Sequence, residues 1–89
     1  MIETFVSHPE VGVVNKSTHH TLIAAELWVR RTLLEKLTSR AVGDRVVQDE
    51  RSSSIWYATY FVETRDGKRR PWLGVIRNGI DRAGDRHAA

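Results

Sequence analysis

Two runs rich in β-branched and aromatic residues dominate the second half of the chain. Residues 54–64 read SIWYATYFVET, and residues 69–77 read RRPWLGVIR. Between them, Asp66 and Gly67 favour a two-residue turn, because both central residues of such a turn take positive φ. The pattern therefore predicts a long β-hairpin that includes strands over about 54–64 and 69–77.

A two-residue loop fixes the pairing of these strands and places Glu63 opposite Arg70 as a cross-strand ion pair. Hairpins with one solvent-facing side alternate apolar and polar residues, whereas both faces of this hairpin are apolar. We therefore expect a helix to cover one face and a partner or ligand to cover the other. The predicted pairing puts Tyr57, Phe61 and Trp72 on one face, and Trp56 and Tyr60 on the other.

Residues 18–39 have a helical pattern without Gly or Pro and consist mainly of strong helix formers. Ahead of them, residues 4–6 and 11–14 predict one or two short strands or an extended arm, and residues 45–50 predict a further strand. A helix followed by three strands favours an α+β fold. We expect one long helix, about 18–39, packed on an antiparallel sheet of three to five strands, with a long C-terminal β-hairpin.

A helical wheel of residues 18–39 shows two apolar ridges with polar residues between them. One ridge contains Leu22, Val29 and Leu33, and the other contains Ile23, Leu27 and Leu34. Two interpretations of the residues between them stay open. The side chains extend past their apolar neighbours to water, or they line a polar cleft or an oligomer seam. The residues predicted for that cleft are His19, Glu26 and Arg30.

On the opposite side of the same wheel, small residues flank Trp28. This position predicts an exposed Trp, a residue type that is enriched at protein interfaces. The alternative is an exposed Trp without a partner. We predict a homodimer or another protein interface, because Trp28 and the second apolar sheet face both need cover. The predicted interface residues are Trp28, Trp56, Tyr57, Tyr60 and Phe61.

The composition indicates one small domain. The chain has 89 residues, a net charge of +3 and no cysteine, which excludes disulfides and thiolate metal sites. No apolar run approaches the roughly 20 residues of a membrane span, and residues 1–10 do not have a signal-peptide pattern. We expect a cytoplasmic protein with a domain over residues 1–79 and a flexible tail over residues 80–89.

The residues capable of chemistry do not form a recognisable catalytic or metal-binding motif. His19 and His20 are adjacent, so on a helix they point in different directions and cannot chelate one ion. We therefore predict no metal site, no cofactor and no enzymatic activity. One enzymatic alternative stays open, a small ribonuclease of the toxin type. Its candidate residues are Arg51, Tyr57, Arg77, Arg82 and His87.

Basic and aromatic residues are concentrated together in the predicted hairpin. Aromatic side chains on a sheet can stack on bases when Arg or Lys residues beside them hold the phosphates. We therefore expect a non-catalytic domain that binds a nucleic acid or a nucleic-acid-handling protein. The alternative is a small inhibitor or adaptor, of the kind that mobile elements encode, which blocks a larger protein. The predicted nucleic-acid-binding residues are Arg65, Lys68, Arg69, Arg70, Trp72 and Arg77.

Overall fold

A computed structural model of the chain describes residues 1–36, 42–54 and 56–78. In chain order the elements are β1 (Ile2–His8), β2 (Gly12–His19), α1 (Leu22–Glu35), β3 (Arg45–Asp49), the 3-10 helix η1 (Glu50–Ser52), β4 (Tyr57–Glu63) and β5 (Arg69–Asn78).

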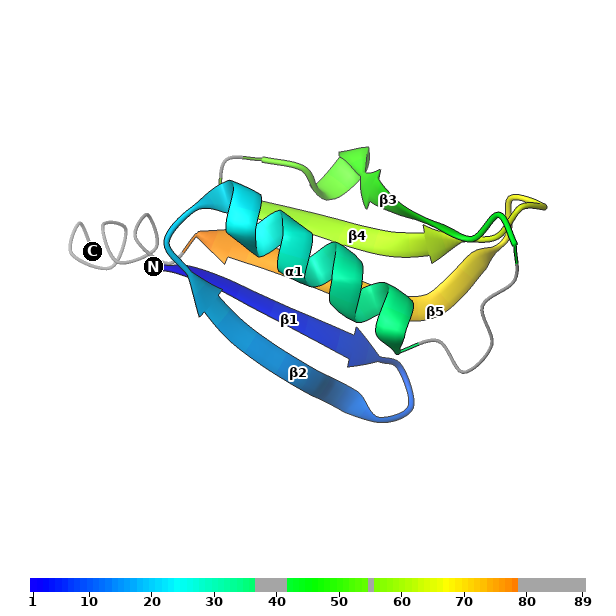
Figure 1. Cartoon of the computed structure of the whole chain (residues 1–89), viewed down its shortest axis with the longest axis horizontal. Helices are drawn as coiled ribbons and strands as arrows, with labels where there is room; N and C mark the ends of the chain where they lie inside the picture. The colour runs from blue at the N-terminus through cyan, green and yellow to red at the C-terminus, as the bar shows by residue number, and fades with distance from the viewer. Residues whose placement is uncertain (37–41, 55, 79–89) are drawn as a thin grey trace.

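Within the described residues, the strands form one antiparallel sheet in the order β2-β1-β5-β4-β3, and α1 crosses one face of it (Figure 1). The predicted α+β fold with a C-terminal β-hairpin is confirmed. The predicted tail, 80–89, lies outside the described residues.

The N-terminal segment is a β-hairpin and not an arm. Ile2 pairs with His19 at the open end of β1 and β2, so residues 18 and 19 belong to the sheet. The helix begins at Leu22, where the Thr21 side chain accepts a hydrogen bond of 3.1 Å from the backbone N–H of Ala24. The predicted helix start at 18 is therefore wrong, because residues 12–19 find a pairing partner in β1. The predicted helix end, near 39, lies outside the described residues.

The β4–β5 turn contains three residues and not the predicted two. The N–H of Thr64 donates to the carbonyl of Lys68 at 2.8 Å, and the N–H of Gly67 donates to the carbonyl of Thr64 at 2.9 Å. Gly67 has a φ of +85°, whereas no described non-glycine residue, Asp66 included, has a positive φ. Only one residue of the turn therefore needs the left-handed conformation, and the loop gains a residue.

This turn changes the register of the hairpin. Phe61 pairs with Leu73 and not with Trp72, and Glu63 pairs with Arg69 and not with Arg70. The register shifts between Phe61 and Glu63. The predicted cross-strand pair of Glu63 with Arg70 is wrong, and Trp72 lies on the sheet face opposite the one that carries Phe61.

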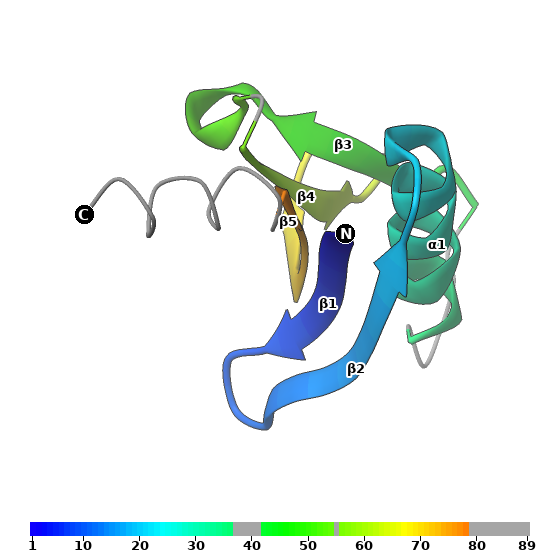
Figure 2. The same ribbon diagram turned by 90° about the vertical axis from the view of Figure 1, so that its left-hand side faces the viewer.

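The hydrophobic core lies between α1 and the sheet. The buried residues of α1 are Ala25, Val29, Thr32 and Leu33. They pack on the sheet residues Ile2, Val6, Tyr60, Val62 and Ile76. The sheet is twisted, so that its edge strands β2 and β3 run in clearly different directions (Figure 2).

The helix is rotated relative to the predicted wheel. Ala25 is fully buried, and Trp28 is half-buried against the core, so the prediction of an exposed Trp28 is wrong. The side of α1 that faces away from the sheet instead carries Ile23 and Leu27, which are 75% and 60% exposed. The wheel misplaced the buried face because these two exposed apolar residues shift the apparent apolar centre of the helix.

Candidate functional site

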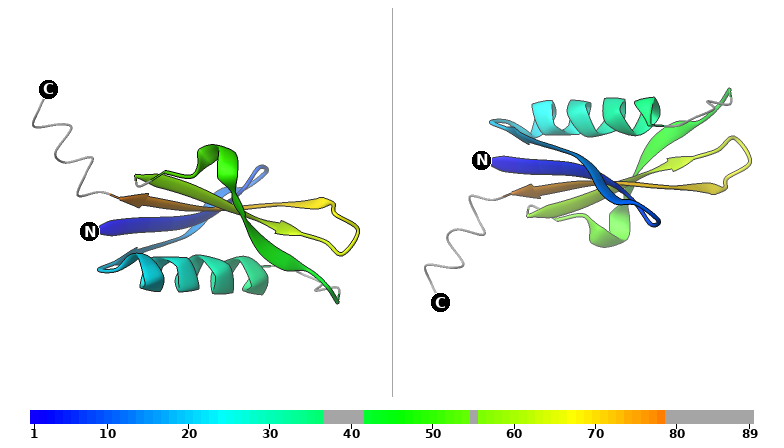
Figure 3. Two further views of the ribbon diagram at one scale, coloured as in Figure 1. Left: turned by 90° about the horizontal axis from the view of Figure 1, so that it is seen from above. Right: turned by 90° about the horizontal axis from the view of Figure 1, so that it is seen from below.

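The sheet face opposite α1 is covered only in part by the described residues. On this side η1 lies over β4, where the Ser52 hydroxyl hydrogen bonds to the Thr59 hydroxyl (Figure 3). We call the remainder of this surface the open face. Side chains of the open face, assigned from the strand register, include Glu3, Phe5, Val13, Lys16, Phe61, Arg69, Leu73 and Arg77.

Near the β3–β4 side of the open face, an arginine lies over an aromatic ring. The Arg69 guanidinium carbon is 4.1 Å from the centre of the Phe61 ring. One of its nitrogens is 3.8 Å from a carboxylate oxygen of Asp49. The negative ring face attracts the guanidinium, and Asp49 restricts the orientation of the Arg69 side chain. The result is a flat cationic group that covers a half-buried ring and presents a plane on which a nucleobase can stack.

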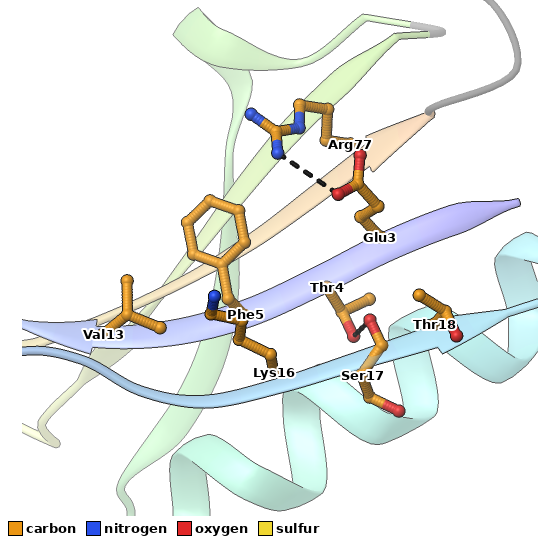
Figure 4. A pocket seen from close by; sticks show the side chains of 8 residues that line it. All are labelled: Glu3, Thr4, Phe5, Val13, Lys16, Ser17, Thr18 and Arg77. Carbon is orange, nitrogen blue, oxygen red and sulfur yellow. Dashed lines mark hydrogen bonds and ion pairs between the residues drawn. The ribbon is translucent and has the colours of Figure 1, made fainter.

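A second arginine–phenylalanine contact borders a hollow of about 400 Å³ over β1 and β2 (Figure 4). The Arg77 guanidinium carbon lies 5.7 Å from the Phe5 ring centre, and a guanidinium nitrogen lies 3.3 Å from a Glu3 carboxylate oxygen. Lys16 is the residue on β2 that pairs with Phe5, and Val13 lines the same hollow. The hollow therefore combines an aromatic ring, aliphatic surface, one carboxylate and two cationic side chains.

Five cationic side chains lack an ion-pair partner within the described part of the chain. Arg31 and Lys36 belong to the helix segment, whereas Lys16 lies at the hollow, and Arg65 and Lys68 lie at the tip of the β4–β5 hairpin. Arg65 and Lys68 are exposed. Cations without a carboxylate partner are available to bind phosphates, because no internal ion pair has to break first.

Two of the predicted nucleic-acid-binding residues lie elsewhere. Trp72 is half-buried on the helix-facing side of β5, where its ring centre is 4.6 Å from that of His8. Arg70 donates to Asp44 at 3.1 Å, and the Asp44 side chain is only 3% exposed. This ion pair joins the start of β3 to β5. Of the remaining predicted residues, Arg69 and Arg77 lie on the open face, and Arg65 and Lys68 lie at the hairpin tip.

The predicted interface residues are dispersed. Tyr60 is 3% exposed and belongs to the core under α1, so it cannot contact a partner. Trp28 packs near His19, with ring centres 5.9 Å apart. Trp56 is 41% exposed and lines a cleft between α1 and the sheet. Tyr57 shares its side of β4 with Phe61, as predicted, through strand alternation.

The predicted polar cleft exists in part. The Arg30 guanidinium donates to Glu26 at 3.0 Å and to the carbonyl of Val46 at 3.0 Å, and its carbon lies 5.5 Å from the Tyr60 ring centre. Burial raises the pKa of Tyr60 above its ordinary value of 10.0; the Glu26 carboxylate raises it further, and Arg30 lowers it. His19 does not line this cleft, because it belongs to β2 on the other side of the helix.

The residues of the ribonuclease alternative are only partly described. Arg51 is on η1, with its Nε atom 3.6 Å from an Asp49 oxygen. Tyr57 and Arg77 are paired residues on β4 and β5. Arg82 and His87 lie outside the described residues, so this set stays a prediction. Among the described residues, no three His, Asp or Glu side chains are grouped as metal ligands.

Sequence reasoning missed the residues that form the hollow, above all Phe5, Lys16 and Glu3. The signal was the alternation in residues 2–7, where Ile2, Thr4 and Val6 face α1, whereas Glu3 and Phe5 face the opposite side. Residues 15–19 were predicted as the entry to a helix, and this prevented the recognition of β2 as the pairing partner of that strand.

Comparisons of the chain with protein-family models, with characterised proteins and with solved structures found no match. Within the described ranges, no helix has the length and apolar character needed to cross a membrane. The chain is an α+β protein, and its described residues form a sheet with one helix-covered face and one open face.

Proposed function

We propose that this chain is a non-catalytic domain that binds single-stranded nucleic acid on the open face. The observation that carries the proposal is the pair of arginine-capped phenylalanines, Arg69 with Phe61 and Arg77 with Phe5. Aromatic rings and guanidinium planes stack on bases of any sequence, and basic side chains beside them hold the backbone. All four side chains share one face of one sheet.

The two arginine-capped phenylalanines are stacking points that lie far enough apart to contact different bases. Phe5 is on β1 and Phe61 is on β4, with β5 between these strands. Two strand spacings separate them by roughly 10 Å. Single strands have unstacked bases that can reach such points, whereas the bases of a duplex are already stacked on one another. A single strand that crosses β1, β5 and β4 would place phosphates near Lys16 at one side and near Lys68 at the hairpin tip.

Fluorescence anisotropy with labelled single-stranded DNA and RNA tests the proposal. We expect Phe5→Ala and Phe61→Ala each to weaken binding roughly 5- to 150-fold, which corresponds to the loss of about 1–3 kcal/mol of stacking per base. Val11→Ala is the matched control, because Val11 is 70% exposed in the β1–β2 turn and does not line the hollow. Circular dichroism of each variant checks that the fold is intact.

The same experiment can contradict the proposal. If wild-type protein binds neither strand type at low salt, the open face does not bind nucleic acid, and the alternative of a small protein inhibitor becomes the better interpretation. If binding is retained unchanged in both phenylalanine variants, stacking on the open face is not the mode of binding. A matching duplex should bind more weakly than the single strand.

A further inference from the structure

The helix α1 is apolar on its outward side as well as on its buried side. Ile23 and Leu27 are 75% and 60% exposed, and Leu34 is half-buried. Their spacing of four and seven residues places them along one line of the helix. We call these three residues the outward ridge. A helix at the surface of a two-layer protein has a polar outward side, so an outward ridge of this kind indicates a third layer.

We infer that the outward ridge is covered by the same ridge of a second copy of this chain, with the two α1 helices packed antiparallel about a two-fold axis. In this arrangement Ile23 lies across from Leu34, and Leu27 lies near the axis. Identical surfaces meet in a two-fold dimer, so the ridge must be complementary to itself. Its apolar residues at both ends satisfy this condition.

The charges beside the ridge favour the antiparallel orientation. Glu26 and Arg30 lie along one flank of the ridge, with side chains 45% and 37% exposed. An antiparallel pair places Glu26 of each helix across from Arg30 of the other. In a parallel pair related by a two-fold axis, this flank instead faces the opposite flank of the partner, so Glu26 and Arg30 do not meet their counterparts. The flank is therefore complementary to itself in the antiparallel orientation.

The size of the contact sets the expected strength of the dimer. The helix α1 has 14 residues, so it is about 21 Å long. A contact between two helices of this length buries less surface than the roughly 800 Å² that each partner of a stable complex buries. We therefore expect a dimer that dissociates on dilution. Because α1 and the open face are on opposite sides of the sheet (Figure 3), both open faces stay accessible in the dimer. The inference is thus independent of the proposed function.

Sedimentation velocity over protein concentrations from about 10 µM to about 1 mM tests the dimer. We expect the dimer fraction of wild-type protein to rise with concentration. Ile23→Lys and Leu27→Lys should remain monomeric throughout, and Val11→Lys should behave as wild type. Val11 is a matched control because it is an aliphatic residue, 70% exposed, in a turn away from α1. A wild-type protein that is monomeric at every concentration would overturn the inference, as would dimers that persist in both helix variants.

Cross-linking provides a second readout that does not depend on the lysine variants remaining folded. The chain has no cysteine, so Leu27→Cys introduces a single thiol next to the expected two-fold axis. A short thiol-specific bifunctional linker should convert this variant to a covalent dimer, and Val11→Cys should stay monomeric under the same conditions. Equal cross-linking of the two variants, or none at Leu27→Cys, would show that the ridge is not the interface.

Discussion

A Cβ atom added to Gly74 on β5 would lie 2.5 Å from the Cγ1 atom of Val29 on α1. The helix therefore rests directly on the backbone of the central strand at this point. Val29 and Leu33, the two residues above Gly74, are fully buried. The absence of a side chain at position 74 allows α1 to pack closely on this face of the sheet.

Gly74→Ala should destabilise the protein, because the added methyl group overlaps Val29 and Leu33, both of which are packed on all sides. We expect the free energy of unfolding to fall by about 1–3 kcal/mol, as is typical of overpacked cores. Urea denaturation measures it. In the Val29→Ala background the same substitution should be better tolerated, because the overlapping methyl group is gone. Unchanged stability of Gly74→Ala would show that α1 does not pack this closely.

The two ion pairs at the start of β3 should differ in their contributions to stability. The Asp44 side chain is 3% exposed and paired with Arg70, whereas Arg45 is 71% exposed in its pair with Glu63. Asp44→Ala leaves a partly buried arginine unpaired and should lower the free energy of unfolding by about 2–4 kcal/mol. Glu63→Ala should lower it by less than about 1 kcal/mol. Thermal or urea denaturation of the two variants compares them, and equal losses would be inconsistent with a buried Asp44.

The raised pKa of Tyr60 predicts a loss of stability at alkaline pH. The folded protein favours the neutral phenol, so this contribution is fully present below pH 10.0, the ordinary pKa of tyrosine, and is lost as the pH rises through the higher pKa of the folded state. Tyr60→Phe lacks the ionising group. Urea denaturation at several pH values from neutral to about pH 11 should show a smaller alkaline decline for Tyr60→Phe than for wild type. Identical declines would indicate that Tyr60 ionises normally.

The unpaired cations at the hollow and at the hairpin tip predict the salt dependence of nucleic-acid binding. Lys16, Arg65 and Lys68 lie at these two places and have no described carboxylate partner. Three phosphate contacts to a single strand give a slope of about −2 in a plot of log K against log salt. Arg65→Ala should make the slope shallower by about 0.7. Arg31→Ala removes the same charge from exposed α1 and should leave the slope unchanged; equal changes would assign the effect to net charge alone.

The sequence predicted the kind of fold because the strand-forming runs and the helix have strong local patterns. The α+β class, a helix within residues 18–39 and the three C-terminal strands are all evident from periodicity and turn residues, although the helix begins only at Leu22. The register of the β4–β5 hairpin could not be predicted from the sequence, because it depends on whether Asp66 takes a positive φ. In the structure Asp66 does not have a positive φ. This single difference moves Trp72 to the helix-facing side of β5.

The candidate site was predicted only where it belongs to the C-terminal hairpin. Arg69 and Arg77 were found there from their proximity to aromatic residues, whereas Phe5 and Lys16 were not. The order of strands explains the difference. β1 pairs with β5 from the far end of the chain, and nothing local in residues 2–19 indicates that distant partner. Contacts between residues that are remote in sequence are set by packing, which a local pattern does not encode.

Methyl NMR during titration with a single-stranded oligonucleotide tests the central proposal most directly. Val13 and Leu73 carry methyl groups on the open face, whereas Ile23 and Leu27 carry them on the outward side of α1. Binding on the open face predicts that the Val13 and Leu73 signals shift in proportion to occupancy while the Ile23 and Leu27 signals stay in place. Shifts at Ile23 and Leu27 without shifts at Val13 and Leu73, or no shift at saturating oligonucleotide, would contradict it.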